Sequence, residues 1–320
     1  MKIITPVCSI NEIEPVINAG ADEVYFGIMT KKWVEQYGNG DLITRRQSEW
    51  THFTSFEDLS DIVSKTNEQH CLSILTLNAR YSTMQLPYIY EIIEQWEEQG
   101  GQAVMVSDIE LLLWLNEYHP KLIKHLSVMA GVFNSQSVRF FEQFNVSRFV
   151  LPREMTVSEM AQLIKNAPKP MEFEAIVMFQ KCPFIDSFCN FSHTFNYQPF
   201  IVDDYSGDKS CLPVLESDDP CNSEHGCRMT FFCKGKKIRP VDNDDLKTPF
   251  CAACAFDQLL KAGVSHFKIA GRGFPVEWVT TAVRFVRQII ETENIKPAQI
   301  KEKYKSAFGR DCSLTNCYYT

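Results

Sequence analysis

The sequence lacks the features that mark secreted and membrane proteins. The longest strongly apolar run, Ile109 to Leu115, is broken by Glu110, and residues 1–9 hold one lysine and no apolar stretch of signal-peptide length. We therefore expect neither secretion nor membrane insertion, and we expect the chain to be cytoplasmic.

Excess positive charge is missing too. The formal net charge is -8, so no global basic field attracts the chain to nucleic acid, and DNA is not an expected partner. The sequence also shows no Ser-His-Asp or Cys-His arrangement and no His-Glu-x-x-His motif. The sequence therefore shows no set of catalytic residues for a conventional protease mechanism.

Cysteine, in contrast, is abundant. The chain has 12 cysteines, although a reducing compartment does not favour structural disulfides. Eight of the 12 lie between Cys182 and Cys254. The other four are scattered, and we interpret them as buried or inert thiols: Cys8, Cys71, Cys312 and Cys317.

Short β-type runs alternate with longer helical patterns, which indicates parallel β/α units. A helix, a glycine and a strand follow one another in residues 91–106 and again in residues 259–269. Eight strands are predicted, at residues 3–6, 23–28, 72–77, 103–106, 126–132, 148–151, 173–178 and 266–269. This number favours a single β/α (TIM-type) barrel, with a doubly wound sheet as the alternative.

Two stretches interrupt the alternation. Residues 30–54 form a polar, aromatic loop after the second strand, and residues 179–250 form a cysteine-rich insertion after the seventh. Loops at the carboxyl ends of barrel strands build the active site, so both should overhang one face. We expect a barrel over residues 1–292 and a C-terminal tail over residues 293–320.

Six cysteines of the insertion and the following helix start suit a metal centre: Cys182, Cys189, Cys221, Cys227, Cys251 and Cys254. A thiolate at a helix N-terminus has a lowered pKa, which favours metal binding. Four soft thiolates from one loop indicate zinc or an iron-sulfur cluster, and the spacing does not decide between the two. A chance set of loop thiols is the alternative.

Several segments together resemble one known family. They are ITPVCSINEIEPVINAGADEVYFG at residues 4–27, SVMAGVFNSQSVRFFEQFNVSRFVLPRE at 127–154, EFEAIVMFQKCPFIDSFCNFS at 172–192 and CAACAFDQLLKAGVSHFKIAGRG at 251–273. The chain resembles the U32 peptidase (collagenase-like protease) family from residue 3 to about residue 290. The resemblance implies a 4Fe-4S cluster, with zinc as the alternative cofactor.

The resemblance also implies a ligand set. Its members are Cys182, Cys189, Cys227 and Cys251, with Cys221 and Cys254 as alternates. Cys227 is preferred over Cys221 because Arg228 follows it, as in the Cys-Arg pair of the family.

Short members of the family, such as UbiU and UbiV, work as a pair in dioxygen-independent hydroxylation during ubiquinone synthesis, and longer ones act in RNA hydroxylation or bear the collagenase label. The resemblance therefore implies an iron-sulfur enzyme or subunit that hydroxylates a small quinone precursor or RNA, together with a second U32-like barrel subunit. A metal-dependent collagenase-like peptidase and a non-catalytic iron-sulfur partner subunit are the alternatives.

Three positions depart from the family pattern. Met178 and Phe179 replace a His-Gly pair, and Ala270 replaces the glutamate of the Lys-Ile-Glu-Gly-Arg segment. These changes remove an imidazole and a carboxylate, the groups best suited to general acid-base catalysis. They weaken any catalytic role inherited from the family.

Four polar residues near predicted strand ends are candidates for substrate contact: Asn78, Arg153, Glu154 and Arg272. The guanidinium of Arg272 offers a fork of donors to an anion, and its alternative is a salt bridge that closes the barrel. For Arg153 and Glu154, the alternative is a structural ion pair with each other.

Overall fold

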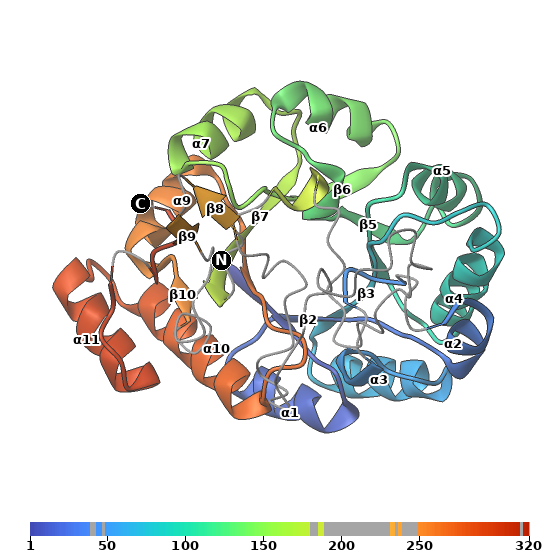
Figure 1. Cartoon of the computed structure of the whole chain (residues 1–320), viewed down its shortest axis with the longest axis horizontal. Coiled ribbons are helices and arrows are strands. Elements are labelled where there is room, and N and C mark those ends of the chain that lie inside the picture. The colour runs from blue at the N-terminus through green and yellow to red at the C-terminus, as the bar shows by residue number, and fades with distance from the viewer. Residues whose placement is uncertain are drawn as a thin grey trace.

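The computed structural model describes residues 1–38, 43–46, 49–179, 185–188, 231–233, 236–238, 249–313 and 316–319. Eight parallel strands pair in sequence order, and β6, β7, β11 and β1 close the sheet into a barrel (Figure 1). They are β1 (Lys2–Pro6), β2 (Glu23–Phe26), β3 (Leu72–Leu77), β4 (Ala103–Val106), β5 (Ile123–Leu126), β6 (Val146–Val150), β7 (Glu172–Phe179) and β11 (His266–Ile269). The predicted TIM-type barrel is confirmed, and the doubly wound alternative is wrong.

Helices form a ring around the barrel, and α11 packs outside α10 (Figure 1). They are α1 (Ile10–Asn18), α2 (Lys31–Tyr37), α3 (Glu57–Glu68), α4 (Leu86–Glu98), α5 (Ile109–Tyr118), α6 (Ser135–Glu142), α7 (Val157–Asn166), α9 (Phe256–Ala262), α10 (Val276–Glu291) and α11 (Pro297–Phe308). No helix in the described part of the chain is long and apolar enough to cross a membrane.

Short elements complete the description. Three further strands are β8 (Phe231–Cys233), β9 (Lys236–Ile238) and β10 (Phe250–Cys251), and the single-turn 3-10 segments are η1 (Glu49–Thr51), η2 (Val128–Ala130), η3 (Asp186–Phe188) and η5 (Ala253–Ala255). Strand β10 runs antiparallel to the end of β7, and β8 pairs with β9.

The fifth strand was predicted in the wrong place. Residues 126–132 are apolar enough for a strand, but β5 ends at Leu126 and a 3-10 turn follows. The Ser127 hydroxyl accepts a hydrogen bond from the N–H of Met129, and Gly131 adopts a left-handed conformation with φ 69°. A side chain that captures the backbone in this way competes with strand pairing.

Two segments outside the predicted alternation each contain a helix. The loop of residues 30–54 contains α2, and the segment of residues 293–320, expected as a tail, contains α11. At the start of α1, Ser9 makes no side-chain cap, and Glu12 accepts the N–H of Cys8 at 2.7 Å. At the start of α7, Thr156 and Glu159 form a capping box.

Large apolar side chains fill the layer between the strands and the helices. Trp96 of α4 is fully buried, and its indole N–H donates to the carbonyl of Ala103 at 3.1 Å. A Cβ at Gly101 would lie 2.1 Å from the indole ring, so this turn into β4 needs glycine. The helix–glycine–strand pattern of the sequence thus follows from close packing at the turn.

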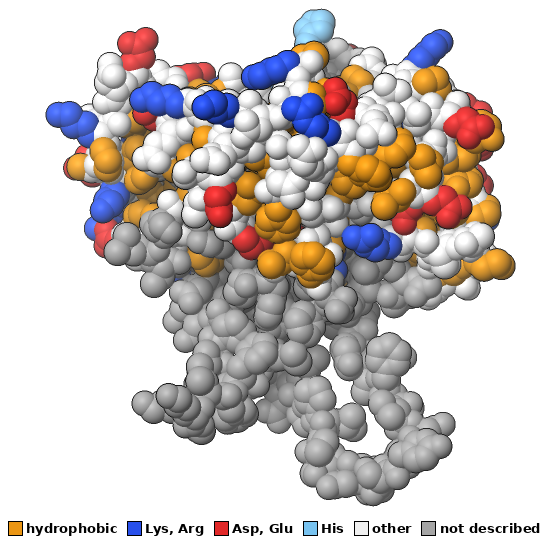
Figure 2. Space-filling model, turned by 90° about the horizontal axis from the view of Figure 1, so that it is seen from above, with side chains coloured by type: hydrophobic (Ala, Val, Ile, Leu, Met, Phe, Trp, Pro, Cys, Tyr) orange, Lys and Arg blue, Asp and Glu red, His pale blue; other side chains and the backbone are white. Residues whose placement is uncertain are grey.

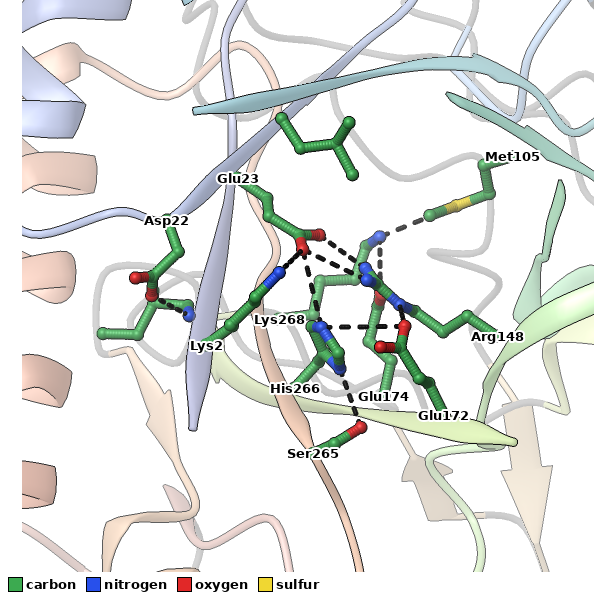
Figure 3. A network of polar contacts seen from close by, with 12 residues as sticks. Lys2, Asp22, Glu23, Met105, Arg148, Glu172, Glu174, Ser265, His266 and Lys268 are labelled. Atoms are coloured by element: carbon green, nitrogen blue, oxygen red, sulfur yellow. Dashed lines mark hydrogen bonds and ion pairs between the residues drawn. The ribbon is translucent and has the colours of Figure 1, made fainter. Parts of the chain in front are cut away.

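The barrel interior near the amino-terminal ends of the strands is charged rather than apolar (Figure 3). Arg148 of β6 donates to Glu23 of β2 at 2.5 and 3.1 Å, and Lys268 of β11 donates to Glu174 of β7 at 2.8 Å. His266 lies 3.5 Å from Glu23. These buried charges are paired across the barrel, and conservation of structure at this end of a TIM barrel serves stability rather than chemistry.

Candidate functional site at the barrel mouth

The four candidate substrate residues all lie on one face of the barrel. Asn78 directly follows β3, Arg153 and Glu154 follow β6, and Arg272 follows β11. This face is the carboxyl end of the strands, where TIM barrels carry their active sites. Their location agrees with the expectation, whereas contact with a substrate stays a prediction.

Asn78 ties two loops of this face together. Its side-chain N–H2 donates to the Ser127 hydroxyl at 3.1 Å, and its side-chain oxygen accepts the backbone N–H of Arg45 at 3.0 Å. The side chain is 9% exposed and uses both ends of its amide in these contacts. Asn78 therefore positions the segment of residues 43–46 over the barrel.

Arg153 pairs with a residue that the sequence did not suggest. Its guanidinium donates through both Nε and Nη2 to the carboxylate of Asp186, with the Nε bond at 2.8 Å. In place of the Arg153–Glu154 pair considered as the alternative to substrate contact, the structure has a fork-to-carboxylate contact between the segment after β6 and η3. This contact anchors residues 185–188 to the barrel mouth.

Glu154 does not pair with Arg153. Neither of its carboxylate oxygens has a hydrogen-bond partner among the described residues, and burial raises the pKa of Glu154, with the charge of Asp186 adding to the effect. A carboxyl group with a raised pKa at the carboxyl end of a barrel strand is suited to holding and releasing a proton.

Arg272 is buried at the mouth, with 5% of its surface exposed. Its Nη2 donates to the Thr44 hydroxyl at 3.2 Å, and that hydroxyl also lies 2.8 Å from His52 Nε2. No carboxylate in the described ranges forms an ion pair with it. The salt bridge considered for Arg272 is thus not found among these residues.

The last residue of β7, Phe179, has a backbone conformation typical of glycine, the residue at this position in the family pattern given above. Phe179 has φ 70°, a left-handed conformation that glycine adopts without strain and a bulky residue rarely does. Its ring packs edge-on against Phe274, with centroids 5.2 Å apart. Packing of this ring against Phe274 offsets part of the strain of the left-handed conformation.

Cys251 is brought to this same strand end. It pairs with Met178, which is fully buried, through the antiparallel contact of β10 with β7. Its sulfur accepts the N–H of Ala253 at 3.3 Å, and burial raises the pKa of the Cys251 thiol well above its usual range. A thiolate at this buried position therefore needs a cation to stabilise it.

The end of the chain packs beside Cys251. Cys317 forms a β-bridge with Cys251, and the N–H of Tyr318 donates to the Cys251 carbonyl at 3.1 Å. Burial raises the pKa of Cys312, as do its neighbours Cys317 and Cys254. Cys312 and Cys317, interpreted as scattered thiols, thus lie with Cys254 around the expected ligand. Only a long-range contact brings them there, and the sequence carries no local signal for it.

The other expected ligands cannot be compared with the structure. Cys182, Cys189, Cys221 and Cys227 lie outside the described residues. Within the described ranges, no three or more His, Cys, Asp or Glu side chains are arranged to hold a metal ion. Cys251 suits a thiolate-ligated cluster in its donor chemistry and in its place beside the end of β7, and Cys182 follows that end by three residues in the sequence.

Comparison with known proteins gives a consistent picture. The family model of peptidase family U32 matches residues 8–320. A collagenase of Porphyromonas gingivalis is 24% identical over 305 residues, which cover 91% of this chain and 65% of that protein. The tRNA hydroxylation protein P of Escherichia coli is 25% identical over 184 residues, covering 57% of this chain and 37% of that protein.

Two further similarities extend over most of the chain. The tRNA hydroxylation protein P2 of Bacillus subtilis is 22% identical over 289 residues, covering 90% of this chain and 85% of that protein. The solved structure of the U32 peptidase Mk0906 aligns with 85% of this chain and 93% of its own, at 12% identity and a TM-score of 0.48. The family match spans nearly the whole sequence, and the chain therefore belongs to peptidase family U32.

Proposed function

We propose that this chain is an iron-sulfur protein that supports dioxygen-independent hydroxylation of RNA, with a small quinone precursor as the second candidate substrate. The cluster part of the proposal is carried by Cys251, a buried thiol held beside the end of β7 at the barrel mouth. The hydroxylation part draws on the relatives named as tRNA hydroxylation proteins.

The ligands of a 4Fe-4S cluster would be Cys182, Cys189, Cys227 and Cys251, with Cys221 and Cys254 as alternates. Such a cluster supplies one-electron transfer when bound. Zinc bound by the same cysteines would supply no redox chemistry. An experiment can therefore distinguish zinc from a 4Fe-4S cluster by whether the bound cofactor takes up electrons.

The residues of the barrel mouth contribute in other ways. Glu154, with its raised pKa, can exchange a proton at a carboxylate oxygen near the end of β6. The Arg153–Asp186 pair and Asn78 hold loops over the same face and so limit the entry of water. Met178 and Ala270 provide no acid or base, so Glu154 is the described candidate for proton transfer.

An RNA substrate would have to be recognised locally. The side of the molecule in Figure 2 shows basic, acidic and hydrophobic side chains interspersed, with no continuous basic surface. With a net charge of -8, we expect binding to depend on contacts at the mouth rather than on a broad electrostatic attraction.

The cluster is tested by purifying the protein without oxygen and measuring iron and acid-labile sulfide. We expect both in the wild type, and loss of both in Cys251→Ala. Cys71→Ala is the matched control, because Cys71 is a buried cysteine at the amino-terminal end of β3, away from the barrel mouth. This variant should keep its iron. Colourless protein that binds zinc would contradict the cluster.

The reaction is tested by expressing the chain in an anaerobic host that lacks its own related proteins. Digested tRNA should contain a nucleoside heavier by one oxygen atom, absent with Cys251→Ala. If tRNA is unchanged and quinone precursors gain the oxygen, the small substrate is correct. If the chain acts only when a second U32-like barrel copurifies, it is the non-catalytic partner.

The collagenase among the relatives supports a second candidate, a metal-dependent peptidase. Cleavage of gelatin by pure protein, lost in Cys189→Ala, would favour this activity over hydroxylation. The described residues show no hydrolytic triad, so the peptidase is the less favoured function.

A further inference from the structure

We propose that Arg272 forms the centre of an oxyanion-binding site at the barrel mouth, which takes a phosphate or carboxylate group of a ligand. The site lies where β11 ends, under the segment of residues 43–46. It is independent of the proposed cluster, because none of its groups is an expected cysteine ligand.

The first observation is an unused donor on a buried guanidinium. Arg272 is 5% exposed, its Nη2 donates to Thr44 Oγ1 at 3.2 Å, and its Nη1 is buried without a hydrogen-bond partner among the described residues. An unsatisfied charged donor in the interior is destabilising, and native structures seldom keep one without a function.

The second observation is the close approach of the Arg272 guanidinium to Gly27, where a residue without a Cβ leaves room for it. A Cβ at Gly27 would lie 2.7 Å from Arg272 Nη1 and 2.7 Å from His52 Cδ2. The guanidinium and the imidazole thus both approach the backbone at the end of β2. Any side chain at position 27 would displace the Arg272 fork.

The third observation is that no counter-charge to Arg272 is found among the residues that the structure describes. Tyr25 and Cys8 neighbour Arg272, but burial raises the pKa of both, that of Cys8 to about 12, so both are neutral at pH 7. Glu12 accepts the N–H of Cys8 at 2.7 Å and forms no described ion pair with Arg272. The remaining charged neighbour is Arg46, which has the same sign.

Burial and the charge of Arg46 lower the pKa of Arg272 to about 10, which still leaves the guanidinium protonated at neutral pH. Arg148, the other arginine that the described structure buries fully, does have carboxylate partners: it pairs with Glu23 and lies 3.7 Å from Glu174. A buried charge with no charged partner is strongly destabilising, and Arg272 has none among the described residues, so a bound anion is its natural complement.

A second guanidinium lies on the same segment. Arg45 follows Thr44, and its Nε and Nη2 are both buried without a hydrogen-bond partner among the described residues. A planar fork of this kind favours phosphate and carboxylate, which accept two parallel hydrogen bonds, over a spherical anion such as chloride. The site should therefore discriminate by the shape of the anion as well as by its charge.

The test is thermal unfolding with inorganic phosphate, malonate or chloride at equal ionic strength. Phosphate or malonate at millimolar concentration should raise the Tm of the wild type by about 3 °C over chloride. A larger shift with phosphate assigns the site to a phosphate group, and a larger shift with malonate assigns it to a carboxylate.

Arg272→Gln should abolish the shift, and Arg272→Lys, which keeps the charge without the fork, should reduce it. Lys at this position also guards against a folding defect in the Gln variant. Arg139→Gln is the matched control, since Arg139 is an exposed arginine of α6. Cys251→Ala should keep the full shift, which separates this site from the cluster.

The proposal is overturned if phosphate and malonate act no differently from chloride on the wild type. It is also overturned if the folded Arg272→Lys variant responds as strongly as the wild type. An equal loss of response in Arg139→Gln would show only general ion binding, and would likewise contradict a site at Arg272.

Discussion

Individual charges inside the barrel differ in how much they depend on their partners. Glu23 is fully buried and accepts two hydrogen bonds from Arg148, whereas Glu172 contacts the same guanidinium at 2.9 Å with 47% of its side chain exposed. The two carboxylates therefore form a matched pair that differs in burial. Their removal separates the effect of a buried ion pair from that of a surface one.

Glu23→Gln should lower the free energy of unfolding by about 3 kcal/mol, because Arg148 is left buried with an incomplete partner. Glu172→Gln should lower it by less than about 1 kcal/mol, as expected of an exposed pair. Urea denaturation at pH 7 measures both. Equal effects of the two changes would show that burial does not set the contribution of the pair.

The contribution of Glu23 to stability should also depend on pH. Burial alone would raise the pKa of Glu23, but hydrogen bonds from His266 and Arg148 hold it well below its usual range. Stability from this group is thus present above the unfolded pKa of about 4.3 and is lost as the pH falls toward the folded value. Glu23→Gln should therefore lose less stability than the wild type between pH 5 and pH 3.

At the scale of single elements, the short strand β10 depends on the chain end that covers it. Tyr318 is 2% exposed, its ring lies 6.2 Å from that of Phe250, and its N–H holds the Cys251 carbonyl. Tyr304 of α11 donates to the carbonyl of Pro249 at 2.5 Å. Both contacts fix the strand that carries the expected ligand.

Tyr318→Ala should therefore destabilise the protein by about 3 kcal/mol through loss of a buried aromatic ring. If Cys251 is a cluster ligand, the variant should also hold less iron per chain, because contacts behind a ligand influence metal affinity. Tyr118→Ala on α5 is the control, since Tyr118 is 61% exposed. Iron content equal to that of the control would show that β10 is held without the chain end.

Element boundaries were predictable where the apolar pattern and the turn chemistry agreed. Residues 72–77 and 103–106 are strands as predicted, because each is a short, largely apolar run after a turn, and residues 266–269 are a strand as predicted after the turn at Gly263. Ser127 and Gly131 instead formed a turn within an apolar run, which periodicity alone cannot distinguish from a strand. The α2 and α11 helices were missed because their sequences are largely polar.

For the whole molecule, the barrel closes through pairing of its own strands. Every one of the eight parallel strands has two neighbours, and the charged interior is paired within the chain. Removing the proposed cluster with a chelator and an oxidant should thus leave the far-UV circular dichroism unchanged and shift the Tm by only a few degrees, or about 2–5 °C. Complete unfolding, as in small zinc domains, would contradict this expectation.

The sequence located the functional face of the molecule but not its contacts. Asn78, Glu154 and Arg272 lie at strand ends, as the order of strands required once a barrel was assumed. The pairing of Arg153 with Asp186 and the lack of an ion pair at Arg272 among the described residues both depend on segments distant in the chain. No local pattern encodes such distances, so the roles of these side chains could not be ranked from the sequence.

The β-bridge between Cys251 and Cys317 also has a consequence for biosynthesis. Cys317 is synthesised 66 residues after Cys251, so the surroundings of Cys251 are complete only once this later segment has been made and has folded back. Any cofactor that needs this cysteine in its final setting would have to bind after that step, and not while strands β1 to β7 are first forming.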